Sequence, residues 1–162
     1  MSGTSYLSGL WISRFLGLAV HVAGWSKDPS TKCGAVIADR CKRVVALGFN
    51  GFPRSLPDTR YDDRSYKLDT VIHAEQNAVL FARTSLEGCG MFVSKPVCCS
   101  CASVIIQAGI CEVHMLWDQD MFGRWSSSVK RAFRNLRVAG VKTFVYDSVT
   151  FARIDDVGEL GP

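Results

Sequence analysis

The feature that most constrains the fold of this chain is the alternation of short apolar runs with helix-forming segments. Two β-branched or apolar runs, residues 33–38 and 43–49, are joined by four polar residues, and this pattern predicts a β-hairpin. From the hairpin onward the expected order is strand, strand, helix, strand, helix, strand, helix, strand. Strands that alternate with helices predict an α/β fold in which neighbouring strands run parallel and are joined by right-handed crossovers.

The other elements follow from apolar periodicity and from helix-breaking residues. After the hairpin we expect strands at residues 91–93, 112–117 and 141–146, and helices at residues 73–83, 99–108 and 125–139. Before it, apolar residues recur at three- and four-residue intervals over residues 7–25 and predict a helix with one face against the core. The polar segment 55–69 and the tail after Asp147 are expected to be irregular. No linker or repeat divides the 162 residues, which predicts one domain over residues 1–162.

Composition excludes several classes of protein. Hydrophobic residues make up 48% of the chain and charged residues 21%, as in a folded globular domain. The most apolar stretch, residues 6–25, is interrupted by polar and charged side chains, so we read it neither as a membrane span nor as a signal peptide. We therefore expect a cytoplasmic protein with no membrane partner. The net charge of +4 suits an anionic small molecule and is too small to predict a nucleic-acid partner.

The cysteines and one histidine predict a metal site. Seven cysteines are present, and three of them lie within four residues, a pattern that does not fit a disulfide framework. His73 begins one predicted helix, and Cys98 and Cys101 begin the next one, directly after a strand. Helix N-termini in neighbouring βαβ units lie at the same end of the sheet. Because catalytic zinc keeps three nitrogen or sulfur ligands and one open position, we predict that these three residues bind one Zn²⁺.

Glu75 is the expected general acid and base. It lies two residues after His73, close enough to move protons without being a ligand. Zinc lowers the pKa of a bound water toward neutrality. H-x-E followed by P-C-x-x-C is the known signature of the zinc deaminases, in which the glutamate transfers the protons.

The second half of the signature is shifted by one residue. Pro96 precedes Cys98 by two positions, and Val97 stands where the signature has proline. Cys99 is therefore an alternative partner for Cys101. One intervening residue rarely suits two thiolates on one ion at a helix start, so Cys98 is assigned as the ligand and Cys99 as a residue that packs beside the site.

Four longer segments resemble the deoxycytidylate (dCMP) deaminase family. Residues 26–37 (SKDPSTKCGAVI) resemble the opening hairpin of that family, and residues 48–54 (GFNGFPR) resemble its G-Y-N-G-x-P-R loop. Residues 73–78 (HAEQNA) and 101–110 (CASVIIQAGI) are similar to its H-A-E-x-N-A and C-A-x-x-I-I-Q-A-G-I segments. The resemblance implies a three-layer cytidine-deaminase-like fold, with a five-stranded mixed sheet flanked by helices.

The resemblance also implies an activity. It is the zinc-dependent hydrolysis of dCMP to dUMP with release of ammonia, which supplies the precursor of dTMP. Water activated by zinc attacks C4 of the base, and Glu75 protonates N3 and the departing amine. Asn50 matches a residue that contacts the sugar, although a turn residue with a left-handed φ explains it equally well. Ala74 is expected beside the substrate.

The charged loop residues are candidate phosphate ligands. Arg54, Arg60 and Arg64, together with Lys27 and Gly51, are the candidates for binding the substrate phosphate or an effector, because arginine forks match phosphate geometry. A solvated charged loop explains each arginine at least as well. By resemblance we expect activation by dCTP, inhibition by dTTP, and a homo-oligomer that is a hexamer.

Some regulated members of the family carry a second, structural zinc. Cys33, Cys41 and Cys89 are available as ligands, but His21 and His114 lie in apolar periodic segments and are interpreted as core or capping residues. We do not predict a second zinc.

Two kinds of alternative remain open. The same chemistry can act on free cytosine, a nucleoside, a modified dCMP or adenosine in RNA. A non-catalytic nucleotide-sensing module or a structural zinc domain belongs to another class, and the presence of Glu75 favours an enzyme over it.

Overall fold

The computed structural model of the protein describes residues 4–154, apart from the side chains of residues 119–125. Its centre is one mixed sheet in the order β2-β1-β3-β4-β5-β6. The strands are β1 (Gly34–Ala38), β2 (Val44–Phe49), β3 (Gly90–Val93), β4 (Glu112–Leu116), β5 (Lys142–Tyr146) and β6 (Arg153–Ile154). β1 is antiparallel to β2 and β3, whereas β3, β4 and β5 run parallel to one another. The predicted α/β class is confirmed.

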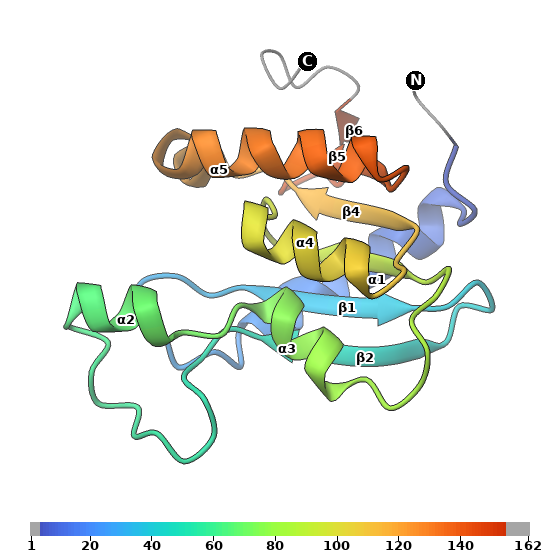
Figure 1. Ribbon diagram of the computed structural model, residues 1–162. Helices are drawn as coiled ribbons and strands as arrows, with labels where there is room; N and C mark the ends of the chain where they lie inside the picture. Colours follow the sequence, from blue (N-terminus) through green and yellow to red (C-terminus); the bar gives the residue numbers. More distant parts are fainter. Residues whose placement is uncertain (1–3, 155–162) are drawn as a thin grey trace.

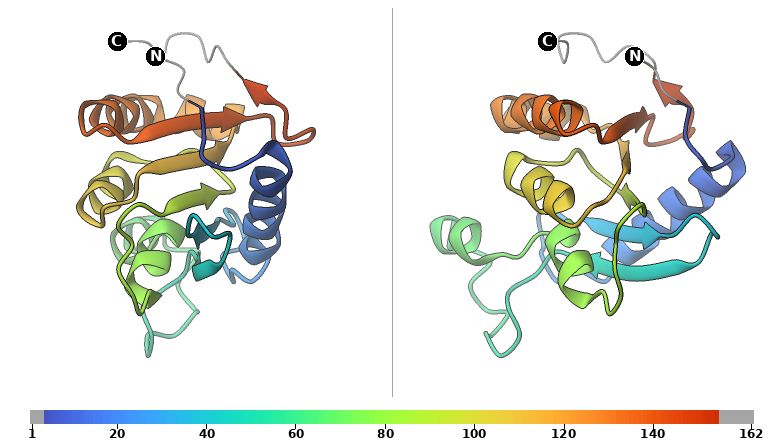
Figure 2. Two further views of the ribbon diagram at one scale, coloured as in Figure 1. Left: turned by 90° about the vertical axis from the view of Figure 1, so that its right-hand side faces the viewer. Right: turned by 45° about the vertical axis from the view of Figure 1, so that its right-hand side comes forward.

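Helices cover both faces of the sheet and give three layers. They are α1 (Gly9–Ala23), α2 (Arg64–Thr70), α3 (Ala74–Phe81), α4 (Cys99–Gln107) and α5 (Gln119–Val138). α1 lies on one face, and α3, α4 and α5 lie side by side on the other (Figures 1 and 2). α2 projects beyond the edge of these layers (Figure 1).

Each central strand is buried on both sides. Val36 and Phe92 pack into the core beneath α1, whereas their chain neighbours Ile37 and Met91 belong to the core that holds the inner faces of α3 and α4. Successive side chains of a strand point to opposite faces, so a strand covered on both faces favours apolar residues throughout. This explains why β1 and β3 appear in the sequence as continuous apolar runs, whereas β4 buries the polar pair Glu112 and His114, whose Oε1 and Nε2 atoms lie 3.0 Å apart.

The sheet has six strands where five were expected. Asp147 begins a turn in which its Oδ1 accepts hydrogen bonds from the backbone N–H groups of Val149 and Thr150, at 3.1 and 2.8 Å. Phe151 has a φ of 57°, in the left-handed region, and the chain reverses there. β6 then pairs antiparallel with β5. The expectation of an irregular tail is therefore wrong for residues 153–154, and residues 155–162 lie outside the described part.

One helix, α2, was not expected, and another, α5, begins earlier than expected. The segment 55–69, expected to be irregular, contains most of α2, because the Oδ1 of Asp63 accepts the backbone N–H of Tyr66 at 3.0 Å and caps the helix. α5 begins at Gln119, six residues before the expected start at residue 125. Among the described residues, no helix is long and apolar enough to cross a membrane.

Gly48 sets how closely α3 approaches the sheet. A Cβ atom at this position would lie 2.2 Å from the carbonyl oxygen of Ala74 and 2.3 Å from the backbone nitrogen of Ala78. Glycine therefore allows the first turn of α3 to rest directly on β2. The side chain of Asn77 adds a hydrogen bond from its Nδ2 to the carbonyl oxygen of Phe49, at 2.7 Å. The N-terminus of α3 is thereby fixed at the end of β2.

Candidate metal centre and active-site cavity

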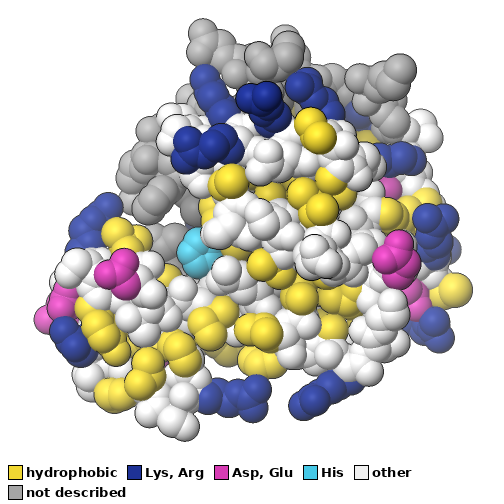
Figure 3. Space-filling model, in the orientation of Figure 1, with side chains coloured by type: hydrophobic (Ala, Val, Ile, Leu, Met, Phe, Trp, Pro, Cys, Tyr) yellow, Lys and Arg dark blue, Asp and Glu magenta, His cyan; other side chains and the backbone are white. Residues whose placement is uncertain are grey.

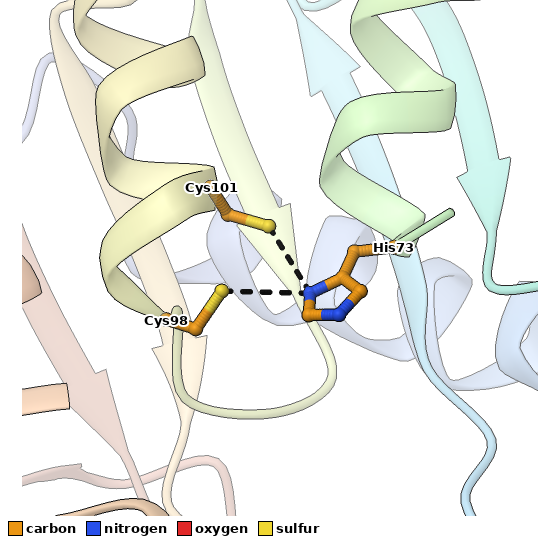
Figure 4. Close-up of side chains that lie close together, drawn as sticks. All are labelled: His73, Cys98 and Cys101. Carbon is orange, nitrogen blue, oxygen red and sulfur yellow. Dashed lines mark hydrogen bonds between the residues drawn. The ribbon is translucent and has the colours of Figure 1, made fainter. Parts of the chain in front are cut away.

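One imidazole and two thiols converge where α3 and α4 begin. His73 and Cys98 are the N-cap residues of these helices, and Cys101 lies in the first turn of α4. The three side chains point toward one another (Figure 4). The Nδ1 atom of His73 lies 3.5 Å from the Sγ of Cys98 and 3.3 Å from the Sγ of Cys101. The predicted convergence of the two motifs is therefore present.

These distances fit a tetrahedral zinc site. The three ligand atoms lie within 4.8 Å of one another. Zinc bonds of about 2.0–2.1 Å to nitrogen and about 2.3 Å to sulfur, arranged tetrahedrally, place the nitrogen about 3.5 Å from each sulfur. The separations from Nδ1 of His73 are thus close to those that a shared ion requires, and three ligands leave one coordination position open.

The ionisation of the two cysteines also favours a bound cation. A hydrogen bond from Cys101, joined by one from His73, lowers the pKa of Cys98. The same contact with Cys98, together with burial, raises the pKa of Cys101. Two thiolates this close repel each other unless a cation lies beside both, and a bound metal ion deprotonates a coordinating thiol outright. The donor set therefore suits zinc.

Glu75 lies in the first turn of α3, two residues after the candidate ligand His73. Its side chain is buried, with 7% of the residue exposed, and it lines the cavity described below. Burial raises the pKa of Glu75, opposed by the nearby charge of His73. A raised pKa makes the carboxylate a stronger base, which favours its taking up a proton as an acid–base catalyst does.

The backbone around His73 is held by its own helix. The Oε1 of Gln76 accepts the backbone N–H of His73 at 3.0 Å, and the carbonyl oxygen of His73 accepts the N–H of Asn77 at 2.9 Å. α4 is fixed differently, because Ser128 of α5 accepts the N–H of Cys99 through its Oγ at 3.0 Å. Both helix starts are therefore fixed by hydrogen bonds before any ligand binds.

A cavity of about 550 Å³ opens onto the metal site. Its walls come from the N-terminal ends of α3 and α4, the segment before β1, and α2. The surface is hollowed between α2 and the main body, with a histidine at the edge of the hollow (Figure 3). A volume of this size accepts a ligand as large as a nucleotide.

The structure separates the predicted substrate residues into two groups. Asn50, Ala74 and Arg64 line the cavity. Lys27, Gly51, Arg54 and Arg60 are absent from its walls. Lys27 pairs with Asp58 at 2.6 Å, and Arg60 pairs with Asp63 at 2.8 Å. The guanidinium carbon of Arg54 lies 5.4 Å from the centre of the Phe81 ring, and Gly51 forms a β-bridge with Ile72.

Sequence reasoning missed other residues of the cavity wall. Lys67 lines it from α2, Lys95 from the end of β3, and Ser100 from the first turn of α4. Ser100 Oγ lies 3.2 Å from the Sγ of Cys98. No motif singled out in the sequence contains Lys67. A helical reading of α2 would have placed Lys67 one turn after Arg64.

Known proteins resemble this chain in sequence and in fold. Residues 10–117 match the family model of the cytidine and deoxycytidylate deaminase zinc-binding region. An "Uncharacterized deaminase in luxG 3'region" of Aliivibrio fischeri is 41% identical over 134 residues, which are 82% of this chain and 90% of that protein. Human deoxycytidylate deaminase is 38% identical over 117 residues, 67% of this chain and 66% of that protein.

The solved dCMP deaminase of the cyanophage S-TIM5, in complex with dCMP and dUMP, is similar in fold. Its TM-score is 0.67 at 20% identity, over 86% of this chain and 98% of that chain. The matched region, residues 10–117, contains His73, Glu75, Cys98 and Cys101. The chain therefore belongs to the cytidine and deoxycytidylate deaminase family and carries its zinc-binding region.

Proposed function

We propose that the protein catalyses the zinc-dependent hydrolytic deamination of dCMP to dUMP with release of ammonia. The observation that carries this proposal is the convergence of His73, Cys98 and Cys101 beside the buried carboxyl of Glu75, at the base of a nucleotide-sized cavity. Relatives named deoxycytidylate deaminase support dCMP as the substrate.

His73, Cys98 and Cys101 would hold the metal. When bound there, zinc supplies Lewis-acid activation of the attacking water and stabilises negative charge that develops at C4 of the base. Glu75 accepts the proton of the water, protonates N3 of the pyrimidine, and delivers a proton to the departing amine. Its burial keeps these transfers away from bulk solvent.

Asn50 lines the cavity and is our candidate for binding the sugar. Its Oδ1 accepts the backbone N–H of Cys33 at 2.7 Å, and its Nδ2 donates to the carbonyl oxygen of Thr31 at 2.9 Å. An amide oxygen has two lone pairs, so Oδ1 can accept one further hydrogen bond, from a sugar hydroxyl. Ala74 also lines the cavity, and its small side chain leaves room for the base.

Arg64 is our candidate for the phosphate. Three basic residues line the cavity, and two of them have acidic partners: Lys67 pairs with Asp28, and Lys95 pairs with Asp118. Among the side chains that the structure describes, those of residues 4–118 and 126–154, no ion-pair partner is found for Arg64. Its planar guanidinium can donate two parallel hydrogen bonds to a phosphate.

A panel of substrates tests this proposal. Turnover of dCMP, deoxycytidine, dCTP and 5-substituted dCMP is followed by ultraviolet absorbance. We expect kcat/KM to be highest for dCMP or a 5-substituted dCMP, and we expect Arg64→Met to lower it for dCMP but not for deoxycytidine. A preference for deoxycytidine in the unmodified protein would contradict the nucleotide substrate.

We also propose regulation by dCTP as activator and dTTP as inhibitor. The resemblance of residues 48–54 to the family loop supports it, and Lys27, Gly51, Arg54 and Arg60 remain the proposed effector residues. Rates measured against dCMP concentration, with and without each triphosphate, test this idea, and superimposable curves would remove it. We place the enzyme in the cytoplasm, since seven free cysteines are typical of a reducing compartment.

A further inference from the structure

The helix that walls the cavity has few attachments to the rest of the fold. α2 contains no buried residue, and it projects beside the sheet rather than packing on it (Figure 1). At its C-terminal end, a β-bridge joins Ile72 to Gly51. The ring of Tyr66 contacts that of Phe52, with centroids 5.6 Å apart, and the side chain of Lys67 attaches the helix on the cavity side. The position of α2 therefore depends on a small number of contacts.

Lys67 makes the tightest of these contacts. Its Nζ lies 2.8 Å from Oδ1 and 2.7 Å from Oδ2 of Asp28, and it donates to the Oγ of Ser30 at 2.6 Å. The side chains of Lys67 and Asp28 are 13% and 1% exposed, whereas those of the Lys27–Asp58 pair are 71% and 36% exposed. A shielded pair is screened far less by water and salt than an exposed one.

Asp28 extends this contact to the opposite wall of the cavity. Its Oδ1 also accepts the backbone N–H groups of Ser30 and Thr31, at 2.9 and 3.1 Å. Its Oδ2 accepts a longer hydrogen bond from Nδ2 of Asn50, at 3.4 Å. One carboxylate therefore connects α2 with the loop that orients Asn50.

The donors of Lys67 are already engaged. A lysine ammonium group has three N–H donors, and Lys67 has three acceptor atoms within hydrogen-bond distance, two on Asp28 and one on Ser30. The positive charge of Lys67 is thus compensated within the protein. Arg64, one turn earlier on α2, is the residue left to meet an anion.

We infer that the Lys67–Asp28 pair is a positioning pair, which fixes α2 so that Arg64 and Leu68 line the cavity that opens onto the metal site. Lys67 does not bind the phosphate itself. The expected change in KM rests on the proposed nucleotide substrate. The role of the pair in holding α2 does not. The pair stabilises the bound and the reacting substrate equally, so its loss changes KM more than kcat.

Steady-state kinetics on dCMP with three variants of the zinc-loaded protein test the inference. In Lys67→Met we expect KM to rise roughly tenfold, with kcat changed by less than about threefold, because uniform binding is lost. Lys67→Arg keeps the charge and should recover most of the affinity. Asp28→Asn should raise KM as well. If Lys67 were a phosphate ligand, Asp28→Asn would free it, and KM would fall. A fall, or an unchanged KM in folded Lys67→Met, would overturn the inference.

A double-mutant cycle separates an indirect role from a direct one. If Lys67 acts by holding Arg64, Lys67→Met should add little to the KM of an Arg64→Met protein. Independent effects that multiply would contradict the inference. The matched control is Arg43→Met, which removes an exposed ion pair with Asp39 at the distant β1–β2 turn. Both kinetic parameters should stay unchanged in this control.

Hydrogen exchange tests the inference without any substrate. In Lys67→Met the backbone amides of α2 should exchange faster, while those of α4 and the zinc content stay as in the unmodified protein. This measurement stands even if dCMP is not the substrate, so failure of the proposed function and failure of the positioning pair can be told apart. Equal exchange of α2 in both proteins would overturn the inference.

Discussion

At the scale of single residues, the proposed chemistry depends on Glu75, whose buried side chain lines the cavity together with the candidate ligands His73 and Cys98. Glu75→Gln keeps the size of the side chain but can neither accept nor release a proton. We expect kcat to fall by about 10²–10⁴-fold or more, the contribution of general acid–base catalysis, with zinc still bound. Kinetics, elemental analysis and dCMP binding by calorimetry check this.

The alternative role for Glu75 is to stabilise its helix. An acidic residue near a helix N-terminus contributes a fraction of a kcal/mol up to about 1 kcal/mol to stability. In that case Glu75→Gln would lower the melting temperature slightly and leave turnover almost intact. A folded, zinc-loaded variant with near-normal kcat would contradict the proposed mechanism.

Single substitutions also test whether Cys98 or Cys99 binds zinc together with Cys101. Cys98→Ala and Cys101→Ala should each lose zinc, because each removes one of the converging ligands. Cys99→Ala should keep it, since the Sγ of Cys99 is contacted by Nδ2 of Asn135 at 3.7 Å and is not part of the ligand group. Elemental analysis of the three variants decides the register. Loss of zinc from Cys99→Ala would show that the assignment is wrong by one residue.

Asp28 gives the protein a predictable response to acid. Burial alone would raise its pKa, but the hydrogen bonds from Lys67, Ser30 and Thr31 outweigh burial, and the pKa lies below its ordinary value of 3.8. Its folded pKa is lower than its unfolded pKa, so its stabilising contribution is present above about pH 4 and is lost as the pH falls through the folded value.

Denaturant unfolding of Asp28→Asn and of the unmodified protein, measured between pH 7 and pH 3, checks this prediction. The stability difference between the two proteins should be largest near neutral pH and should shrink below pH 4. Loss of zinc in acid affects both proteins and cancels in the comparison. A difference that stays constant over this range would contradict it.

At the scale of elements, the contact between α3 and β2 positions half of the metal site. Gly48→Ala places a Cβ atom 2.2 Å from the carbonyl oxygen of Ala74, so α3 must move away from the sheet. We expect a loss of about 1–3 kcal/mol or more in the free energy of unfolding, as for other overpacked sites. Zinc affinity should fall as well, because His73 caps the displaced helix.

Gly9→Ala is the matched control. Apart from its chain neighbours and its own helix backbone, no atom of the described residues lies within 4 Å of a Cβ placed at Gly9, at the start of α1, so this change should leave stability unchanged or slightly raised. Melting curves and zinc titrations of both variants make the comparison. Equal behaviour of the two would argue against close packing as the reason for glycine at position 48.

At the scale of the whole molecule, we predict a homo-oligomer, a hexamer by resemblance to the family. Large apolar side chains remain exposed on the single chain, among them Trp25 at 49% and Leu80 at 66%. Single exposed apolar residues are ordinary, so the resemblance carries this prediction more than the surface does. Light scattering at working concentration measures the mass in solution. A monomer alone would contradict it.

Sequence patterns, together with the resemblance to the family, predicted five of the six strands, the α3 and α4 starts and the candidate metal ligands. The runs that form β1 and β3 are apolar on both faces, and a strand of this kind is typically buried between layers of helices. His73, Cys98 and Cys101 fall at helix starts that follow from chain order. The topological rule for helix N-termini then brings them together without knowledge of any side-chain contact.

Tertiary structure decided which basic residues are paired and how the edge of the sheet ends, because neither apolar periodicity nor a sequence motif carries this information. Whether a basic residue is free or paired depends on partners far away in the chain: Lys67 meets Asp28 across 39 positions, and Lys27 meets Asp58 across 31. β6 likewise exists because the turn at Asp147 brings a short tail segment beside β5. Ion pairing and edge-strand pairing are long-range contacts, so the sequence alone predicted the fold class and the candidate metal ligands, whereas only the folded chain decided which cations line the cavity.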